Sequence, residues 1–181
     1  YLENYTKDLP VSTMRAEFSI NEQKETILEE MIQRKPDLVA FSVYIWNVEM
    51  VRDLSVLFKK VLPSVKILSG GPEVSYKSRE HLEEFQGDFI IRGEGEESYR
   101  SLLQVLLSGG KLSEVRGLTY KEEDEVFENP PREKMDLSKV PYPYEEKEDL
   151  RGKLSYLEAS RGCPYQCSYC LSSSERDLRF M

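Results

Sequence analysis

The sequence is poor in the features that disulfide-bonded, membrane-spanning and nucleic-acid-binding proteins need. It has three cysteines among 181 residues, and an odd number cannot pair completely into disulfides. No apolar run approaches the ~20 residues of a membrane-spanning helix, and no signal peptide is visible. The net charge of −8 argues against the basic stripe of a nucleic-acid surface. We therefore expect a protein of the reducing cytoplasm, with neither a membrane nor a nucleic acid as its partner.

All three cysteines fall within eight residues near the end of the chain. Cys163, Cys167 and Cys170 have the spacing C-x3-C-x2-C, and Gly162 and Pro164 bend the backbone around them. Thiolates at this spacing can face one metal centre. A structural zinc ion normally takes four protein ligands, whereas an iron–sulfur cluster with three cysteines leaves one iron open and fits the number of thiols. The alternatives are a reduced loop with incidental cysteines, or a C-x-x-C redox pair with a spare thiol.

This segment resembles the signature of the radical S-adenosylmethionine (SAM) enzymes, C-x3-C-x-aromatic-C. The resemblance implies that Cys163, Cys167 and Cys170 ligate a [4Fe–4S] cluster and that Tyr169 lies beside the adenine of SAM. In that family the open iron binds SAM, which is cleaved to a 5′-deoxyadenosyl radical. The run Leu154 to Ser160 predicts the strand that enters the cluster loop. Only eleven residues follow Cys170, so we expect a truncated radical SAM domain.

Strands and helices alternate through most of the chain before the cysteines. The pattern predicts strands at Met14–Ile20, Leu38–Val43, Val65–Leu68 and Phe89–Ile91. The second of these is a continuous apolar run, which is typical of a strand buried on both faces of a parallel sheet. Helices are predicted from Asn21, from Asn47, around Leu82 and Phe85, and from Tyr99 to Leu107, before Gly109-Gly110. The alternation predicts an α/β fold with a flavodoxin- or Rossmann-like, doubly wound parallel sheet.

Three parts of the chain are expected. Thr119-Tyr120 and Val126-Phe127 predict a small hairpin that closes an α/β domain at residues 1–128. Residues 129–153 hold four of the nine prolines and predict a linker, and the truncated radical SAM domain begins at residue 154. The polar stretch Tyr1 to Asp8 has the character of a helix end, so a further strand is expected before it.

Unusual residues gather where three of the predicted strands end. In an open α/β sheet, ligands bind outside the carboxyl ends of the strands. Glycines there let the backbone approach a flat or bulky ligand, and Asn47 is placed to cap a helix. The alternative is that these are ordinary tight turns and that Trp46 packs in a core or between domains. The three segments are Ser42-Val43-Tyr44-Ile45-Trp46-Asn47, Ser69-Gly70-Gly71-Pro72-Glu73 and Arg92-Gly93-Glu94-Gly95-Glu96.

Together with the cysteine motif, this layout resembles the radical SAM enzymes that carry an N-terminal cobalamin (B12)-binding domain. The G-G-P and G-E-G-E turns match those expected of that group. Many B12 domains use D-x-H-x-x-G, whose histidine binds cobalt, but His81 lacks that context and is predicted to be a bystander. A degenerate domain without cobalamin stays an alternative. The resemblance implies a cobalamin face made of Ser42, Tyr44, Trp46, Gly70, Gly71, Gly93 and Glu94.

The resemblance implies a methyltransferase that acts on an unreactive carbon and uses a [4Fe–4S] cluster, SAM and cobalamin. Its partners would be a metabolite substrate and an electron donor such as flavodoxin or ferredoxin. The nearest alternative is an oxidative cyclase resembling the anaerobic Mg-protoporphyrin IX monomethyl ester cyclase. A methylthiotransferase is disfavoured because its N-terminal domain usually brings three more cysteines. A non-catalytic flavodoxin-like domain with a structural metal is a further alternative, and the present chain alone is expected to be inactive.

Overall fold

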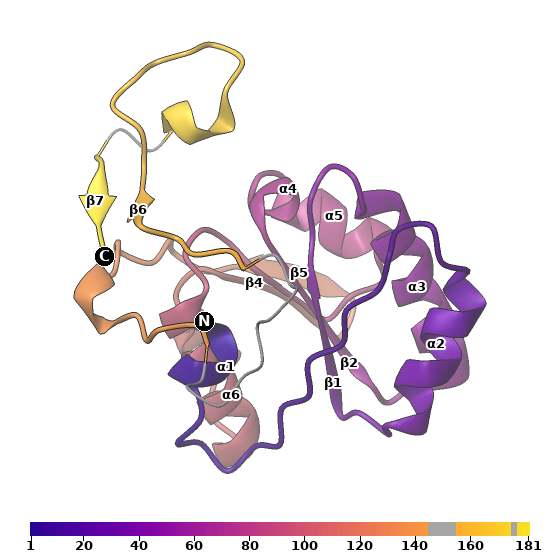
Figure 1. Ribbon diagram of the computed structural model, residues 1–181. Helices are drawn as coiled ribbons and strands as arrows, with labels where there is room; N and C mark the ends of the chain where they lie inside the picture. Colours follow the sequence, from indigo (N-terminus) through magenta and orange to yellow (C-terminus); the bar gives the residue numbers. More distant parts are fainter. Residues whose placement is uncertain (145–154, 175–176) are drawn as a thin grey trace. The chain divides into compact units, whose positions relative to one another are not determined.

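The computed structural model describes residues 1–144, 155–174 and 177–181, which divide into two compact units (Figure 1). The larger unit is Val11–Glu133, and the smaller one combines Tyr1–Pro10 with the described part of Lys134–Met181. The predicted boundaries at residues 128 and 153 stay a prediction. The second of them lies outside the described residues.

A five-stranded sheet forms the centre of the larger unit. Strands β1, β2 and β3 run parallel, whereas β4 and β5 form the antiparallel hairpin that completes the sheet. This mostly parallel α/β sheet confirms the predicted fold class and the predicted hairpin. In spatial order the strands are β1 (Leu38–Ser42), β2 (Lys66–Gly70), β3 (Phe89–Ile91), β4 (Leu118–Glu122) and β5 (Glu125–Glu128).

Helices cover both faces of this sheet. Helices α2 (Lys24–Gln33) and α3 (Val48–Val61) lie on one side, and α6 (Glu96–Ser108) lies on the other (Figure 1). The short helix α4 (Pro72–Ser75) follows β2, and α5 (Ser78–Glu84) contacts β3, β4 and β5. A parallel sheet needs cover on both faces because its strands are apolar on both. A 3-10 turn, η1 (Leu112–Glu114), lies between α6 and β4.

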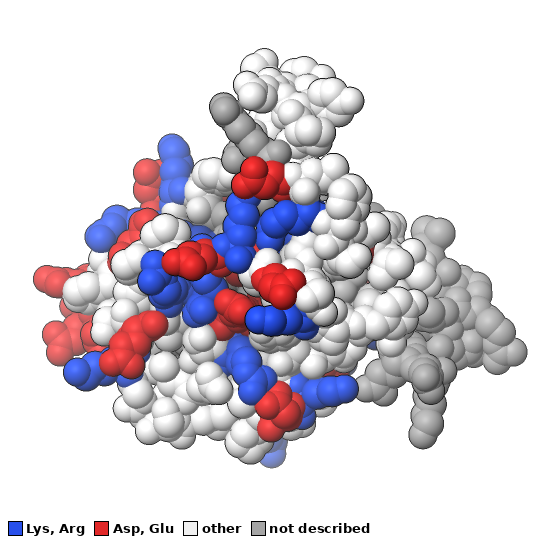
Figure 2. Space-filling model, turned by 90° about the vertical axis from the view of Figure 1, so that its left-hand side faces the viewer, with Lys and Arg blue, Asp and Glu red and all other residues white. Residues whose placement is uncertain are grey.

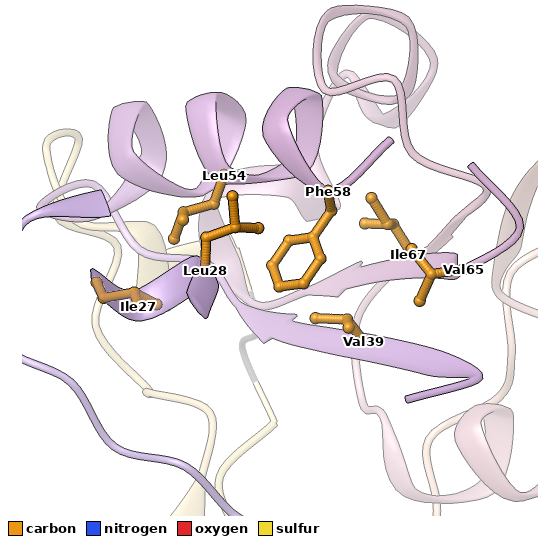
Figure 3. Packing of buried hydrophobic residues seen from close by; sticks show 7 residues of the cluster. All are labelled: Ile27, Leu28, Val39, Leu54, Phe58, Val65 and Ile67. Carbon is orange, nitrogen blue, oxygen red and sulfur yellow. The ribbon is translucent and has the colours of Figure 1, made fainter. Parts of the chain in front are cut away.

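The main apolar cluster lies between helices α2 and α3 and strands β1 and β2. Its central side chain is Phe58, which is fully buried and points from α3 toward the strands (Figure 3). Apolar residues at helical spacing on α3 meet the alternate residues of each strand, as the period of each element requires. The cluster consists of Ile27, Leu28, Val39, Leu54, Phe58, Val65 and Ile67.

Two of the predicted strand features are wrong. Residues 11–19 form no strand, and Met14 and Ile20 are exposed, although Phe18 packs against the main cluster. An alternating pattern forms a strand only where a neighbour completes the ladder, and no described strand pairs with this segment. Strand β1 is not buried on both faces, since Ala40 is exposed. It is an edge strand in the described part of the sheet.

The smaller unit contains short elements only. Helix α1 (Leu2–Tyr5) and the 3-10 turn η2 (Leu137–Lys139) precede a two-stranded antiparallel ribbon, β6 (Ser160–Arg161) and β7 (Arg179–Phe180), with η3 (Leu171–Ser174) between its strands. The strand predicted from Leu154 to Ser160 is therefore wrong over most of its length. Residues 155–159 are not in a ladder, and Leu154 lies outside the described residues.

Charges of both signs are mixed on the surface. Figure 2 shows a face on which Lys and Arg side chains lie next to Asp and Glu side chains, without a continuous basic stripe among its described residues. None of the described helices has both the length and the apolar character that crossing a membrane demands.

Candidate functional site

The three turns singled out in the sequence lie at one edge of the sheet. Ser42 at the end of β1 pairs in register with Gly70 at the end of β2, and Gly70 pairs with Ile91 at the end of β3. The loop after each strand therefore leaves the sheet at the same level. This alignment brings Gly70 and Gly71 between the loop that begins at Val43 and the loop that begins at Arg92, as expected for parallel strands.

The loop between β1 and α3 is folded around the side chain of Asn47. The amide Nδ2 of Asn47 donates to the carbonyl of Ser42 at 2.9 Å, and its Oδ1 accepts from the backbone N–H of Tyr44 at 2.7 Å. Asn47 does occupy the N-cap position of α3, but its side chain makes no cap hydrogen bond to the helix. The predicted helix cap is thus wrong, because the side chain stabilises the loop instead.

This loop bears an aromatic pair, the half-buried Tyr44 and the exposed Trp46. The rings of Tyr44 and Trp46 are stacked, with their centroids 4.6 Å apart and their planes within 5° of parallel. Trp46 is 63% exposed, so the alternative that it packs in the core is wrong. Because the two rings are parallel, they offer a flat, amphipathic surface beside the glycine turn that follows β2.

Gly71 is required by the fold itself. Its φ is +113°, and a Cβ at this position would lie 2.5 Å from the carbonyl oxygen of Val43. The neighbouring backbones are held together because the N–H of Val43 donates to the carbonyl of Gly70 at 2.7 Å. Gly71 thus allows the backbone at Val43 to pack closely against it, so its glycine is explained by the fold without a ligand.

Gly70 and Gly93 differ from Gly71 in their surroundings. A Cβ on Gly70 would meet only the carbonyl oxygen of Ile91, at an ordinary 3.7 Å, and a Cβ on Gly93 would meet no atom within 4 Å. Packing alone does not require a glycine at position 70, whereas a ligand that approaches the backbone closely at this strand end would require one.

Ser75 joins two of the turns and was not predicted from the sequence. Its hydroxyl donates to the carbonyl of Gly71 at 2.9 Å and accepts from the backbone N–H of Gly93 at 3.1 Å. The residue ends the short helix α4, four positions after Gly71. A serine at this place in a G-G-P-x-x-S turn is a weak signal, because its second partner comes from a different loop.

The charged residues after β3 are directed to other parts of the unit. The guanidinium of Arg92 donates to Glu128 Oε1 at 2.7 Å and to the carbonyl of Asn129, so it binds the hairpin side of the sheet. Glu96 is buried in the first turn of α6, where the positive end of the helix dipole favours a carboxylate. Glu94 is half-buried beside the exposed Gly93.

His81 lies apart from these turns, on helix α5. Its ring is largely buried and meets Phe85 edge-on, with the ring centroids 5.6 Å apart. The Nδ1 atom is buried without a hydrogen-bond partner among the described residues, and the nearest carboxylate oxygen, on Glu84, is 3.9 Å away. His81 therefore has a packing role on the helix.

The cysteine segment is an open loop between β6 and β7. It leaves β6 through Gly162, whose φ is +88°, and the N–H of Cys170 donates to the carbonyl of Cys167 at 3.1 Å. Cys163 and Cys167 are partly exposed, Cys170 is exposed, and Tyr169 is 90% exposed. Across the part of the chain that the structure describes, no three His, Cys, Asp or Glu side chains are grouped closely enough to hold a metal ion. The predicted ligand set stays a prediction.

The mostly parallel sheet and the glycine turns at its carboxyl edge place the larger unit among the α/β ligand-binding domains. The model of the B12 binding domain family matches residues 7–103, which is more than half of the chain. The chain belongs to this family.

Known relatives extend the similarity beyond this domain. The hopanoid C-3 methylase of Methylococcus capsulatus is 32% identical over 160 residues, covering 82% of this chain and 30% of the relative. The anaerobic magnesium-protoporphyrin IX monomethyl ester cyclase of Synechocystis sp. is 32% identical over 129 residues, covering 65% of this chain and 25% of the relative. This chain spans about a third or less of the length of the curated relatives it matches.

A solved structure has the same fold. The cobalamin-dependent SAM radical enzyme OxsB, with aqua-cobalamin and SAM bound, matches with a TM-score of 0.72 at 25% identity. The match covers 90% of this chain and 24% of that one. The similarity therefore includes described residues of both units.

Proposed function

We propose that this chain contributes the cobalamin-binding domain and the cysteine segment of a cobalamin-dependent radical SAM enzyme that methylates an unreactive carbon. The observation that carries this proposal is that two features occur in one chain. A B12-binding family domain at residues 7–103 is followed by Cys163, Cys167 and Cys170 at the spacing C-x3-C-x2-C. Neither feature alone specifies the reaction, whereas the two together are typical of this class.

The carboxyl edge of the sheet is the proposed cobalamin surface. Support comes from Gly70, where packing does not require a glycine, and from the stacked rings of the half-buried Tyr44 and the exposed Trp46. A corrin is broad and flat, so it needs a surface on which few side chains protrude. The rest of the proposed surface is Ser42, Gly71, Gly93 and Glu94, all in the same three turns.

The residues of the turns have separate tasks in this proposal. Asn47 fixes the aromatic loop by binding Ser42 and Tyr44, and Ser75 holds the second and third turns at a constant separation. Such a prearranged surface loses little conformational entropy when a ligand binds. His81 on α5 is not part of the surface, so cobalamin would bind without a protein imidazole on cobalt.

Cys163, Cys167 and Cys170 are the proposed ligands of a [4Fe–4S] cluster, with Tyr169 beside the adenine of SAM. The donor set fits the cluster, since three thiolates leave one iron open and no fourth cysteine exists in the chain. When bound, the cluster supplies the electron that cleaves SAM. The exposure of Cys170 and Tyr169 leaves both side chains accessible to these groups.

The electron would come from a donor such as flavodoxin or ferredoxin, and a reducing cytoplasm would keep the thiols free. The chain alone is proposed to be inactive.

The test uses the whole protein under anaerobic conditions. It is reconstituted with iron, sulfide and hydroxocobalamin, desalted, and its iron, sulfide and cobalamin are quantified. It is then incubated with reductant and SAM that carries a deuterated methyl group, in the presence of a small-molecule extract. The proposal predicts four iron atoms per cluster, one cobalamin per chain and a metabolite with a labelled methyl group on carbon. A protein that takes up neither cobalamin nor iron would contradict it.

Oxidative cyclisation is the second candidate, and the similarity to the Synechocystis cyclase favours it. The same incubation separates the two reactions. A methyltransferase moves the labelled methyl group to its product, whereas a cyclase releases 5′-deoxyadenosine and transfers no label.

A further inference from the structure

The backbone that enters the cysteine loop is held by a tyrosine side chain from another part of the smaller unit. The hydroxyl of Tyr144 donates to the carbonyl of Tyr156 and accepts from its N–H, both at 2.7 Å. One side chain therefore satisfies both backbone groups of one residue. In a β-sheet, the two groups of such a residue bind the neighbouring strand.

A second tyrosine binds one backbone group two residues further along. The hydroxyl of Tyr1 accepts from the N–H of Glu158 at 3.1 Å. Tyr1 directly precedes helix α1, whereas Tyr144 follows η2, so the two side chains come from opposite ends of the chain. Helix α1 is itself fixed to the segment before Tyr144, because Asn4 Nδ2 donates to the carbonyl of Tyr142 at 2.8 Å.

The two tyrosines lie on the edge of this segment that β7 does not use. The ribbon pairs Arg161 with Arg179, and the N–H of Met181 donates to the carbonyl of Ala159. In an extended antiparallel pair, alternate residues point their backbone groups to the same edge. Residues 159 and 161 thus face β7, whereas residues 156 and 158 face the opposite edge.

Contacts continue from Glu158 to the first cysteine. The carboxylate of Glu158 accepts from Nε and Nη2 of Arg161, at 3.0 and 2.9 Å. The Arg161 side chain is only 12% exposed, and this residue directly precedes Gly162 and Cys163. The backbone of Glu158 is thus fixed by Tyr1, and its side chain fixes the residue at which the loop begins.

We propose that Tyr1 and Tyr144 are positioning residues that take the place of a neighbouring strand and set the direction in which the cysteine loop leaves β6. The effect on cluster binding rests on the proposed function, whereas the tyrosine contacts themselves do not. On the edge that β7 does not use, the two hydroxyls satisfy both backbone groups of Tyr156 and the N–H of Glu158. The phenolic oxygen suits the position since it both donates and accepts.

The contact itself is tested by amide hydrogen exchange in the whole protein without cofactors. Tyr144→Phe removes the partner of the Tyr156 N–H, and Tyr1→Phe removes that of Glu158. Each variant should exchange at its own position at least about fivefold faster, the equivalent of one net hydrogen bond. The matched control is Tyr142→Phe, which removes an exposed hydroxyl two residues from Tyr144. Equal exchange in Tyr144→Phe and Tyr142→Phe would overturn the proposal.

The consequence for the loop is tested on the reconstituted protein by electron paramagnetic resonance. The double variant Tyr1→Phe/Tyr144→Phe should retain its iron, but the spectral change caused by SAM should need a several-fold higher SAM concentration. A merely structural role would leave this concentration unchanged, and that result would overturn the positioning role. If the unmodified protein takes up no iron, the proposed function fails while hydrogen exchange still decides the tyrosine contacts.

Discussion

The carboxyl edge of the sheet and the cysteine segment differ in how firmly the protein fixes their candidate residues. At the sheet edge, paired strands and the side chains of Asn47 and Ser75 fix every turn before any ligand binds. The cysteine segment has a two-residue ribbon at its base and exposed side chains at Cys170 and Tyr169. The first region is arranged by the fold. The second bears the proposed ligands, and we expect their final arrangement to depend on the bound group.

The largest effect is expected from the cysteines. Each of Cys163→Ala, Cys167→Ala and Cys170→Ala should abolish cluster uptake, because a site with three thiolates has no spare ligand. The stability of the α/β unit should not change, since none of these side chains belongs to its core. Iron and sulfide analysis after anaerobic reconstitution measures the first effect, and urea unfolding the second. Full iron content in any single variant would show that its thiol is not a ligand.

Substitution of Gly71 should destabilise the larger unit. Gly71→Ala places a methyl group 2.5 Å from the Val43 carbonyl at a φ of +113°. We expect the free energy of unfolding to fall by at least about 2 kcal/mol. The control is Gly93→Ala, whose methyl group meets no atom and whose cost should be about 1 kcal/mol for the positive φ alone. Equal losses in the two variants would mean that the contact with Val43 is unimportant.

Asp88, at the amino end of strand β3, tests how much one partly buried carboxylate contributes to the stability of the larger unit. The carboxylate of Asp88 accepts from Lys59 at 2.6 Å, from Lys66 at 3.0 Å and from the N–H of Ile67 at 2.8 Å, and its side chain is 15% exposed. Asp88→Ala should lower the free energy of unfolding by about 1–3 kcal/mol, since it leaves the buried N–H of Ile67 unpaired and removes the carboxylate partner of Lys59.

The control for Asp88 lies in the smaller unit. Asp177 approaches Lys134 at 3.4 Å with 80% of its side chain exposed, so Asp177→Ala should change stability by less than about 0.5 kcal/mol. Chemical denaturation of both variants measures the difference. A loss in Asp177→Ala as large as that in Asp88→Ala would remove the distinction between the two regions.

The smallest effect concerns pH. A hydrogen bond from Lys24, at 2.5 Å, lowers the pKa of Asp53 below its ordinary value. The unfolded chain therefore binds this proton first as the pH falls. The contribution to stability is present above about pH 4 and is lost as the pH falls through the lower pKa of the folded state. Asp53→Asn should flatten this part of the stability profile; an unchanged profile would show that the exposed pair contributes nothing.

The elements predicted correctly are those whose sequence pattern depends only on neighbouring residues. Phe89–Ile91 was predicted with the right ends because a short apolar run between turn residues has few other outcomes. Gly109 ends α6 in the left-handed conformation, as a glycine after a helical stripe indicates. The strand predicted at Met14–Ile20 failed because alternation does not specify a partner, and no described strand pairs with it.

The candidate site was predicted as a set of turns, but the interactions within it were not. The choice of Gly70 and Gly71 followed from their place after a strand, yet only the structure separates the crowded Gly71 from the open Gly70. Ser75 and Tyr144 act through partners distant in sequence, on Gly93 and Tyr156. A single sequence has no pattern that joins such pairs.

The strand end at Gly70 is the proposed point at which cobalamin approaches the sheet. The most direct test titrates the whole protein with hydroxocobalamin under reducing conditions and compares it with Gly70→Val by absorbance. An added Cβ meets only one atom, at an ordinary distance, and chemical denaturation of the variant checks that the fold is retained. The account predicts uptake of one cobalamin per chain in the unmodified protein and at least tenfold weaker binding, about 1.4 kcal/mol, in the variant. Equal affinities, or no uptake by the unmodified protein, would contradict it.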